Sequence, residues 1–448
     1  MKKNIIFLFA VLLFLTVFAL TNSGASIVFE TEWGTQGNAD GQFDTPEAVA
    51  IDAAGNVYVA DDGLVDTLNC RIQKFDANGT HLTSFGVLGN GVGQFNRAKG
   101  VTVGGDGSIY VLEDIISRIQ RFNTDCTYIT YWGSTGSTAG KFDYPYAIAQ
   151  RSTSTSGATV TLTSDMYVAD ANNDRIQRFR CTYTTCTTTT VTTRTSGTYV
   201  TAWGSLGTTD GLFDEPWGVA VDNSGNVFVS DTYNYRIQKF SAAGTFIKKW
   251  GSNGTAIGEF KLPRGLATDS SGNVYVCDSN NHRIQKFDTN GTYITSWGSN
   301  GAGQGQFAFP RGIAISSAGK IYVADMNNHR IQRFGEVPDP PIIPPVVPGV
   351  GYLQVVGGMN GYVNTAKGDN CLIRYQAGLA GEVKISIFNS SGVLVKSLSD
   401  NTPLNDKSII TVTYDCKDGD GKYLSSGIYT VKITGPALSA VKKFGVAR

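Results

Sequence analysis

The sequence predicts an all-β protein, a six-bladed β-propeller followed by a small β-sandwich. The main observation is one pattern that recurs six times: an apolar strand ending in Asp, a short polar turn, then Arg-Ile-Gln, a basic residue and Phe. A second observation is the even spacing, because Arg236, Arg283 and Arg330 follow one another at intervals of 47 residues. Units of this size that are repeated in series are typical of propeller blades, which bury their faces against one another. The six recurring arginines are Arg71, Arg118, Arg175, Arg236, Arg283 and Arg330.

Each repeat has room for four short antiparallel strands. In one unit these are Gly218–Asp222, Val227–Asp231, Arg236–Phe240 and Phe246–Trp250, and the first and last of the three turns between them contain Gly. Such turns favour hairpins. The fourth strands end in aromatic residues, which we expect to pack between blades. These are Trp33, Phe85, Trp132, Trp203, Trp250 and Trp297.

The sixth unit stops at Phe334 and lacks a fourth strand of its own. The segment from Ile27 to Gly34 matches a fourth strand but has no strand trio before it. We therefore predict that this segment completes the sixth blade. Closure of this kind removes the open strand edges that invite aggregation.

The third blade carries two Thr/Ser-rich insertions, Arg151–Ser164 and Arg180–Thr198. Both join strands at the same face of a propeller. Alternating Thr favours extended strands, so longer hairpins are expected. A flexible or glycosylated segment is the alternative.

The N-terminus predicts export. Residues 1–26 have a basic start, an apolar run from Ile5 to Leu20 and small residues before the expected cleavage near Ser23–Ser26. This is the plan of a secretory signal peptide, and an uncleaved anchor is the alternative. The prediction is a secreted or cell-surface protein with no membrane span after cleavage. Charged residues make up 17% of the chain and the net charge is zero, which argues against nucleic-acid binding.

Seven cysteines are present, and an exported protein can pair some of them. Cys181 with Cys186 and Cys371 with Cys416 are the plausible pairs, and the odd number leaves at least one thiol over.

The propeller, residues 27–335, is followed by a Pro-rich linker and a second unit. Residues 336–350 contain the run Pro338–Pro348, which predicts an extended, semi-rigid spacer. Residues 351–448 are expected to form the sandwich. Its predicted strands include Glu382–Asn389, Val393–Leu398, Ile409–Tyr414 and Gly427–Ile433.

Two turns identify a family resemblance for the propeller. Asp278-Ser-Asn-Asn-His-Arg-Ile and Asp325-Met-Asn-Asn-His-Arg-Ile resemble the NHL repeat, and Gly305-Gln-Phe-x-x-Pro310 is similar to the loop that precedes it. The resemblance covers about residues 27–335. It implies a propeller that mostly serves as a binding scaffold, although a few similar propellers are enzymes.

The C-terminal unit resembles the immunoglobulin-like domain of the flagellar hook cap and the sorting domains of bacterial secreted proteins. The resemblance rests on Val383–Gly392, Asp418–Gly421 and Ser426–Tyr429, whereas Tyr414-Asp-Cys416 replaces the usual Trp-Asp-Gly. It implies sorting, surface attachment or assembly, through contact with surface or secretion machinery.

Two sets of polar residues recur with the blades. The recurring acids are expected to organise their own turns and pair with the recurring arginines, and exposed pairs of that kind contribute about 0–1 kcal/mol each. His282 and His329 occupy equivalent places and are weak metal candidates, because no third histidine aligns with them. No cofactor is predicted. The acids are Asp61, Asp114, Asp170, Asp231, Asp278 and Asp325.

One position varies from blade to blade within a regular frame, the residue after the loop proline. The fold alone does not require Trp, Tyr and two Arg there, and such residues dominate binding hot spots. We predict a ligand surface near the channel mouth, and packing between blades is the alternative. The predicted site is Lys99, Tyr146, Trp217, Arg264 and Arg311, with Glu47 at the same position in the first blade.

These features favour a secreted, non-enzymatic binding scaffold that recognises an extracellular protein, peptide or glycan. A propeller enzyme, either a metal-dependent lyase or a hydrolase, is the alternative. A structural module of a surface layer is a third hypothesis. The sequence shows no nucleophile elbow, HExxH motif or phosphate loop.

Overall fold

The computed structural model divides into two compact units, the first of which spans Ser26–Val337. The structure describes residues 26–63, 69–154, 159–186, 192–194 and 197–337 of that unit, and strands and turns between 352 and 447 of the second. The predicted signal peptide and most of the linker lie outside the described residues. Within the described part, no helix is long and apolar enough to cross a membrane.

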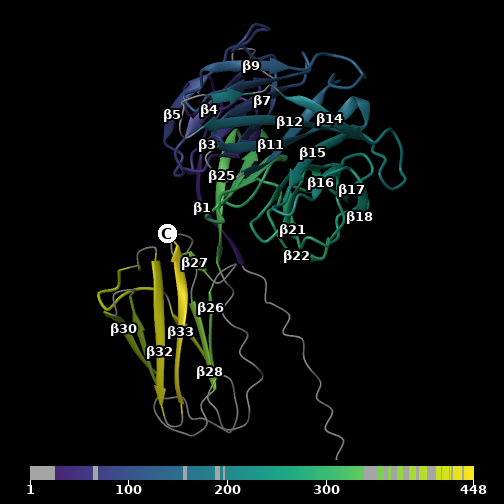
Figure 1. Ribbon diagram of the computed structural model, residues 1–448. Helices are drawn as coiled ribbons and strands as arrows, with labels where there is room; N and C mark the ends of the chain where they lie inside the picture. Colours follow the sequence, from purple (N-terminus) through teal and green to yellow (C-terminus); the bar gives the residue numbers. More distant parts are fainter. Residues whose placement is uncertain are drawn as a thin grey trace, which may run out of the picture. The chain divides into compact units, whose positions relative to one another are not determined.

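The first unit is a six-bladed β-propeller, as predicted (Figure 1). The first blade contains β2 (Pro46–Ile51), β3 (Val57–Asp61), β4 (Arg71–Phe75) and β5 (His81–Phe85). The second contains β6 (Ala98–Val103), β7 (Ile109–Glu113), β8 (Arg118–Phe122) and β9 (Tyr128–Trp132). The third contains β10 (Pro145–Ser154), β11 (Thr159–Asp170), β12 (Arg175–Cys186), β13 (Thr192–Arg194) and β14 (Thr198–Trp203), with the short 3-10 helix η1 (Ala171–Asn173).

The last three blades follow the same plan. The fourth contains β15 (Pro216–Val221), β16 (Val227–Asp231), β17 (Arg236–Phe240) and β18 (Phe246–Trp250). The fifth contains β19 (Pro263–Thr268), β20 (Val274–Asp278), η2 (Ser279–Asn281), β21 (Arg283–Phe287) and β22 (Tyr293–Trp297). The sixth contains β23 (Pro310–Ile315), β24 (Ile321–Asp325), η3 (Met326–Asn328), β25 (Arg330–Val337) and β1 (Ser26–Trp33).

The predicted closure is confirmed. The N-terminal strand β1 pairs antiparallel with β25, so that Trp33 lies opposite Ile331 and Ser26 lies opposite Val337. Ion pairs reinforce the closure, because Arg330 Nη1 lies 2.8 Å from Glu32 Oε2 and Arg333 Nε lies 2.9 Å from Glu30 Oε2. The first and last segments of the propeller therefore share one sheet.

Aromatic side chains fill the space between blades, as predicted. Trp33 of the sixth blade packs at 6.1 Å on Tyr322 of its own blade and at 5.9 Å on Phe75 of the first. Trp250 makes the equivalent contacts with Phe228 and Phe287. Burial of such rings stabilises the stacking of blades by roughly 1.5–3 kcal/mol each.

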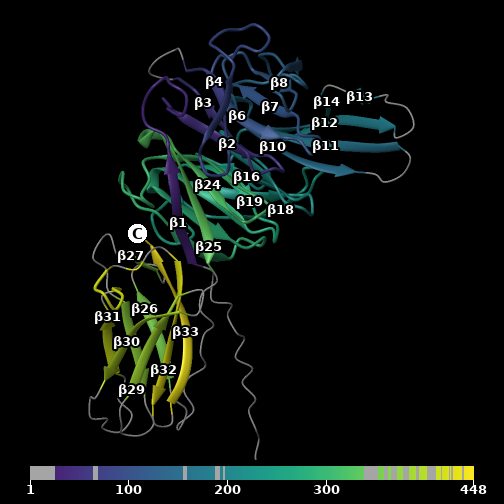
Figure 2. The ribbon, with the colours of Figure 1, turned by 90° about the vertical axis from the view of Figure 1, so that its left-hand side faces the viewer.

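The third-blade insertions form the longer hairpins that alternating Thr predicted. Strand pairing between β10 and β11 continues to Ser154 opposite Leu162, and between β11 and β12 to Cys186 opposite Thr159. These strands reach beyond the other blades (Figure 2). The hairpins extend from the end of the sheet opposite Pro145, which pairs with Asp170.

The expected disulfide between Cys181 and Cys186 is wrong. Both residues belong to β12, and five residues of extended strand span about 17 Å, whereas a disulfide needs Cα atoms within about 7 Å. Cys181 is a buried free thiol. The side chain of Cys371 lies outside the described residues, so its pairing with Cys416 stays a prediction.

The second unit is also built from strands. One sheet has the order β26 (Tyr352–Gly357), β28 (Cys371–Gln376) and β31 (Ile410–Tyr414). The other has the order β27 (Tyr362–Asn364), β33 (Leu438–Ala447), β32 (Gly427–Gly435), β29 (Val383–Phe388) and β30 (Leu394–Asp400). The four strands that the sequence predicted are present, and four further strands accompany them.

Candidate functional site

The varied position lies at the start of the innermost strand of every blade. Strand β19, for example, begins at Pro263, and Arg264 is its second residue. Neighbouring innermost strands pack against each other in a closed ring of six. The second residues of these strands all line one cavity on the axis of the ring. They are Glu47, Lys99, Tyr146, Trp217, Arg264 and Arg311.

One side of the cavity is an aromatic stack. The rings of Tyr146 and Trp217 lie 4.3 Å apart and nearly parallel, at 12°. Arg264 Cζ lies 4.1 Å from the centre of the Trp217 ring, a close cation–π contact. Burial, and secondarily the charge of Asp114, raises the pKa of Tyr146 to about 12. Because Tyr146 belongs to the third blade and Arg264 to the fifth, Trp217 of the fourth blade contacts residues from both neighbouring blades. Glu215 Oε2 accepts a hydrogen bond from Trp217 Nε1 at 3.2 Å.

The other side of the cavity is ionic. Lys99 Nζ lies 2.8 Å from Glu47 Oε1 and 2.6 Å from Asp62 Oδ2, and all three side chains are buried. Arg311 also pairs with Glu47. Burial alone would raise the pKa of Glu47, but Arg311 and Lys99 outweigh it and lower that pKa to about 2. Glu47 is thus a permanent anion that two cations share.

Arg264 is the exception among the six. Among the described residues, no carboxylate lies within ion-pair distance of its guanidinium, and its buried Nε has no hydrogen-bond partner. Burial, and then repulsion by Arg311, lowers the pKa of Arg264 to about 10. Packing between blades accounts for the other ring residues, but it leaves Arg264 without an ion pair among the described residues.

Three further charged residues lie beside the cavity: sequence reasoning missed Arg97 and Asp62, and it assigned Asp114 to a pair with Arg118. Arg97 Nε lies 3.6 Å from Asp62 Oδ1, and its Nη2 lies 3.3 Å from Asp114 Oδ2. Burial raises the pKa of Asp114 to about 6, against the opposing effect of Lys99 and Arg97. A comparison of the position directly after the strand-end acid would have found Asp62 and Asp114, because only the first two blades carry an acid at that position. That position holds Asp62, Asp114, Ala171, Thr232, Ser279 and Met326.

The second blade also corrects the predicted set of acids. Glu113, not Asp114, pairs with Arg118 across the two strands, with Oε2 at 2.6 Å from Nε. Asp114 occupies the next position along and faces Arg97 instead. The turn of this repeat has the ordinary length, because Glu113 and Arg118 are five residues apart like the pairs of the last four blades, and only the choice of Asp over Glu as the marker shifted the alignment.

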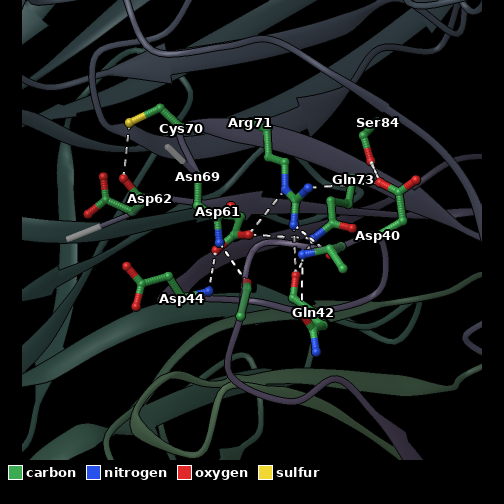
Figure 3. Close-up of polar contacts among 12 residues, drawn as sticks. Asp40, Gln42, Asp44, Asp61, Asp62, Asn69, Cys70, Arg71, Gln73 and Ser84 are labelled. Carbon is green, nitrogen blue, oxygen red and sulfur yellow. Dashed lines mark hydrogen bonds and ion pairs between the residues drawn. The ribbon is translucent and has the colours of Figure 1, made fainter. Parts of the chain in front are cut away.

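The acid–arginine pairs are structural, as predicted, but they are not exposed. In the first blade Arg71 contacts Asp61 and donates to the carbonyl of Gln42 in the loop before β2 (Figure 3). The carboxylates of these pairs are fully buried, whereas the expectation of about 0–1 kcal/mol per pair assumed exposure. The loss of one partner would strand a buried charge, which costs several times more.

Both metal candidates hold a neighbouring loop instead. His282 Nδ1 accepts a hydrogen bond from the backbone N–H of Phe309 at 3.2 Å, and its ring lies edge-on to that phenylalanine at 4.6 Å. His329 Nδ1 contacts the carbonyl oxygen of Asp44. Each histidine sits in the left-handed region, with φ of 54° and 53°. In the part of the chain that the structure describes, no three His, Cys, Asp or Glu side chains are grouped to hold a metal ion.

The family model of the NHL repeat matches residues 213–240, 260–287 and 307–334. A comparison with curated proteins gave no match. Among solved structures, the chain is similar to a streptogramin B lyase at 13% identity, with a TM-score of 0.45, over 69% of this chain and 98% of that chain. It is similar to a gluconolactonase from Xanthomonas campestris at 12% identity, with a TM-score of 0.41, over 70% of this chain and 98% of that chain.

A third likeness is to PorZ, a surface component of the type-IX secretion system of Porphyromonas gingivalis. The identity is 14%, the TM-score is 0.41, and the match covers 92% of this chain and 60% of that protein. Likenesses at these identities carry no information on substrate or partner. The matched residues cover three of the six blades, and the same Gln–carbonyl contact recurs in all six. The propeller of this chain therefore contains NHL repeats.

Proposed function

We propose that this chain is a secreted or cell-surface binding protein whose propeller recognises an extracellular protein, peptide or glycan. The recognition surface is the axial cavity with its ring of Lys99, Tyr146, Trp217, Arg264 and Arg311. The observation that carries the proposal is Arg264, a mostly buried cation that has no ion-pair partner among the described residues and contacts the Trp217 ring at the cavity. Burial of a charge without an ion pair lowers the stability of the fold, and residues that lower stability are retained where function needs them.

The attachment of the linker supports this assignment. Pro310, Asp325 and Arg330 lie at the same end of the sixth sheet, whereas β25 runs to Val337 at the opposite end. The last strand of the propeller therefore ends at the face opposite Arg311. The long strands of the third blade also extend away from the ring face.

The triple variant Trp217, Arg264, Arg311→Ala is expected to lose binding on a glycan and peptide array that the unmodified protein recognises. The reason is that it removes the aromatic anchor and both guanidinium groups, the residue types that dominate hot spots. Because this variant leaves Glu47 with one cation fewer, the single variant Arg264→Gln serves as a second test.

The matched control is Lys248, Lys249→Ala on the outermost strand of the fourth blade, where both side chains are exposed. It should bind like the unmodified protein. Array binding that survives both ring variants, with their melting temperatures intact, would contradict the proposed surface.

We further infer that the C-terminal unit serves in sorting, anchoring or assembly, and that residues preceding Ser26 are removed on export. The basic and apolar N-terminal pattern and the all-β tail support this inference. Cleavage before Ser26 would leave the closing strand β1 whole. N-terminal sequencing of the exported protein should find a start near residues 23–26, and a retained Met1 would argue for an anchor instead.

A further inference from the structure

The cavity contains one cation more than its carboxylates form ion pairs with. Glu47 pairs with both Lys99 and Arg311, and Lys99 has Asp62 as its second partner. Arg264 has no such partner among the described residues, and its contact with the Trp217 ring uses the charge of the guanidinium and not its N–H bonds. Donors of Arg264 therefore remain available at the cavity.

Arg311 adds a second set of donors beside Arg264. It lines the same cavity, its Cζ lies 5.9 Å from the centre of the Trp217 ring, and its Nε is buried without a hydrogen-bond partner. Repulsion between the two guanidinium groups contributes to the lowered pKa of Arg264. An anion placed between them would relieve both the repulsion and the missing hydrogen bonds.

We propose that Arg264 and Arg311 receive a carboxylate group of the ligand, an inference that rests on the proposed binding function. A planar carboxylate matches the fork of a guanidinium, which binds it through two parallel hydrogen bonds. Because Arg264 is the one ring cation without an ion pair among the described residues, a ligand group with a single negative charge is sufficient to pair with it. The anion Glu47 lies beside Arg311 and disfavours a doubly charged group such as a phosphate monoester more than a monoanion.

The carboxylate can come from a peptide or from a uronic acid, and paired probes distinguish these sources. N-acetylglycine is compared with N-acetylglycinamide, and glucuronate with glucose, by calorimetric titration and by thermal shift of the full chain. At least one acid is expected to bind saturably, and its uncharged counterpart at least about tenfold more weakly, because hydrogen bonds to charged groups are the strong ones. The acid that binds identifies the source.

The variant Arg264→Gln keeps a polar side chain but removes the charge and the guanidinium fork, and it is expected to reduce binding of the acid at least about tenfold. Lys248→Gln removes a positive charge from an exposed site and is expected to leave binding unchanged. Inorganic phosphate serves as the competitor, and we expect it to displace the acid more weakly than a second carboxylate does.

Equal binding of acid and amide, binding that survives Arg264→Gln, or no binding of either acid would overturn the carboxylate assignment. The proposed function would still stand if an uncharged array ligand lost binding in the triple variant. Conversely, an array ligand whose binding survives both ring variants would refute the binding surface itself. The two failures therefore give different results.

Discussion

Replacement of Arg283 by methionine is expected to destabilise the folded propeller by about 3–5 kcal/mol. Arg283 Nε lies 2.7 Å from Asp278 Oδ2, and the carboxylate of Asp278 is fully buried. The same guanidinium donates to the carbonyl oxygens of Thr255, Ala256 and Glu259 in the loop before β19, at 2.8–2.9 Å. Methionine would leave the buried carboxylate and three loop carbonyls without this partner.

The matched control is the same substitution at Arg264, in the same blade. Burial and Arg311 lower the pKa of Arg264 from its ordinary value to about 10 in the folded state, so the charged form is disfavoured there by about 3 kcal/mol at neutral pH. The charge of Arg264 therefore lowers the stability of the folded protein at neutral pH. A base whose pKa is depressed in the folded state costs stability at every pH below that pKa, and this cost disappears only as the pH rises from the folded to the unfolded pKa. The loss of the cation–π contact with Trp217 offsets about 0.5–2 kcal/mol of the gain. Arg264→Met should therefore raise the unfolding free energy by about 1–2 kcal/mol.

Denaturant unfolding of both variants measures the contrast. Opposite signs for two arginines of one blade are the expected result, since one completes the architecture and the other is kept at the cost of stability. If Arg264→Met destabilised the protein as strongly as Arg283→Met, Arg264 would be part of the fold and the argument for a ligand would fail.

The repeats made the architecture predictable from sequence. Six copies of one pattern predicted the blades, the aromatic packing and the strand supplied by Ile27–Gly34, because each of these depends on local periodicity or on a missing copy. Alternating Thr also predicted the third-blade hairpins. The position of the varied ring followed from the same alignment, and the cavity contains all five residues that the sequence selected.

The contacts inside the ring could not be predicted in that way. Whether Glu47 or another acid neutralises Lys99 depends on side-chain placement across blades, which no single repeat encodes. In the second blade Glu113 takes the place of the strand-end Asp, whereas an alignment by Asp suggested the next residue, Asp114. Burial of the acid–arginine pairs likewise depends on the loop of the preceding segment that covers them.

Deletion of Ser26–Trp33 from the full chain is expected to abolish cooperative folding of the propeller. The strand contributes Ile27, which is buried, Phe29, which packs edge-on to Phe334 at 6.0 Å, and Trp33. Each such side chain contributes about 1.5–3 kcal/mol by burial, so the total is comparable to the 5–15 kcal/mol stability of a whole domain. Loss of the thermal transition, measured by calorimetry, is the expected result.

A permuted chain separates the loss of closure from the loss of residues. Because Ser26 lies opposite Val337, an Asn-Gly turn can join them, so that residues 26–33 follow residue 337 as an ordinary fourth strand. In this chain, which runs 34–337, Asn-Gly, 26–33 and 338–448, the thermal transition should return. If the deleted chain melted like the unmodified protein, β1 would not be needed for closure. If the permuted chain failed to fold while the unmodified protein folded, the order of synthesis and not the missing strand would control closure, because all the contacts of β1 would be available in both.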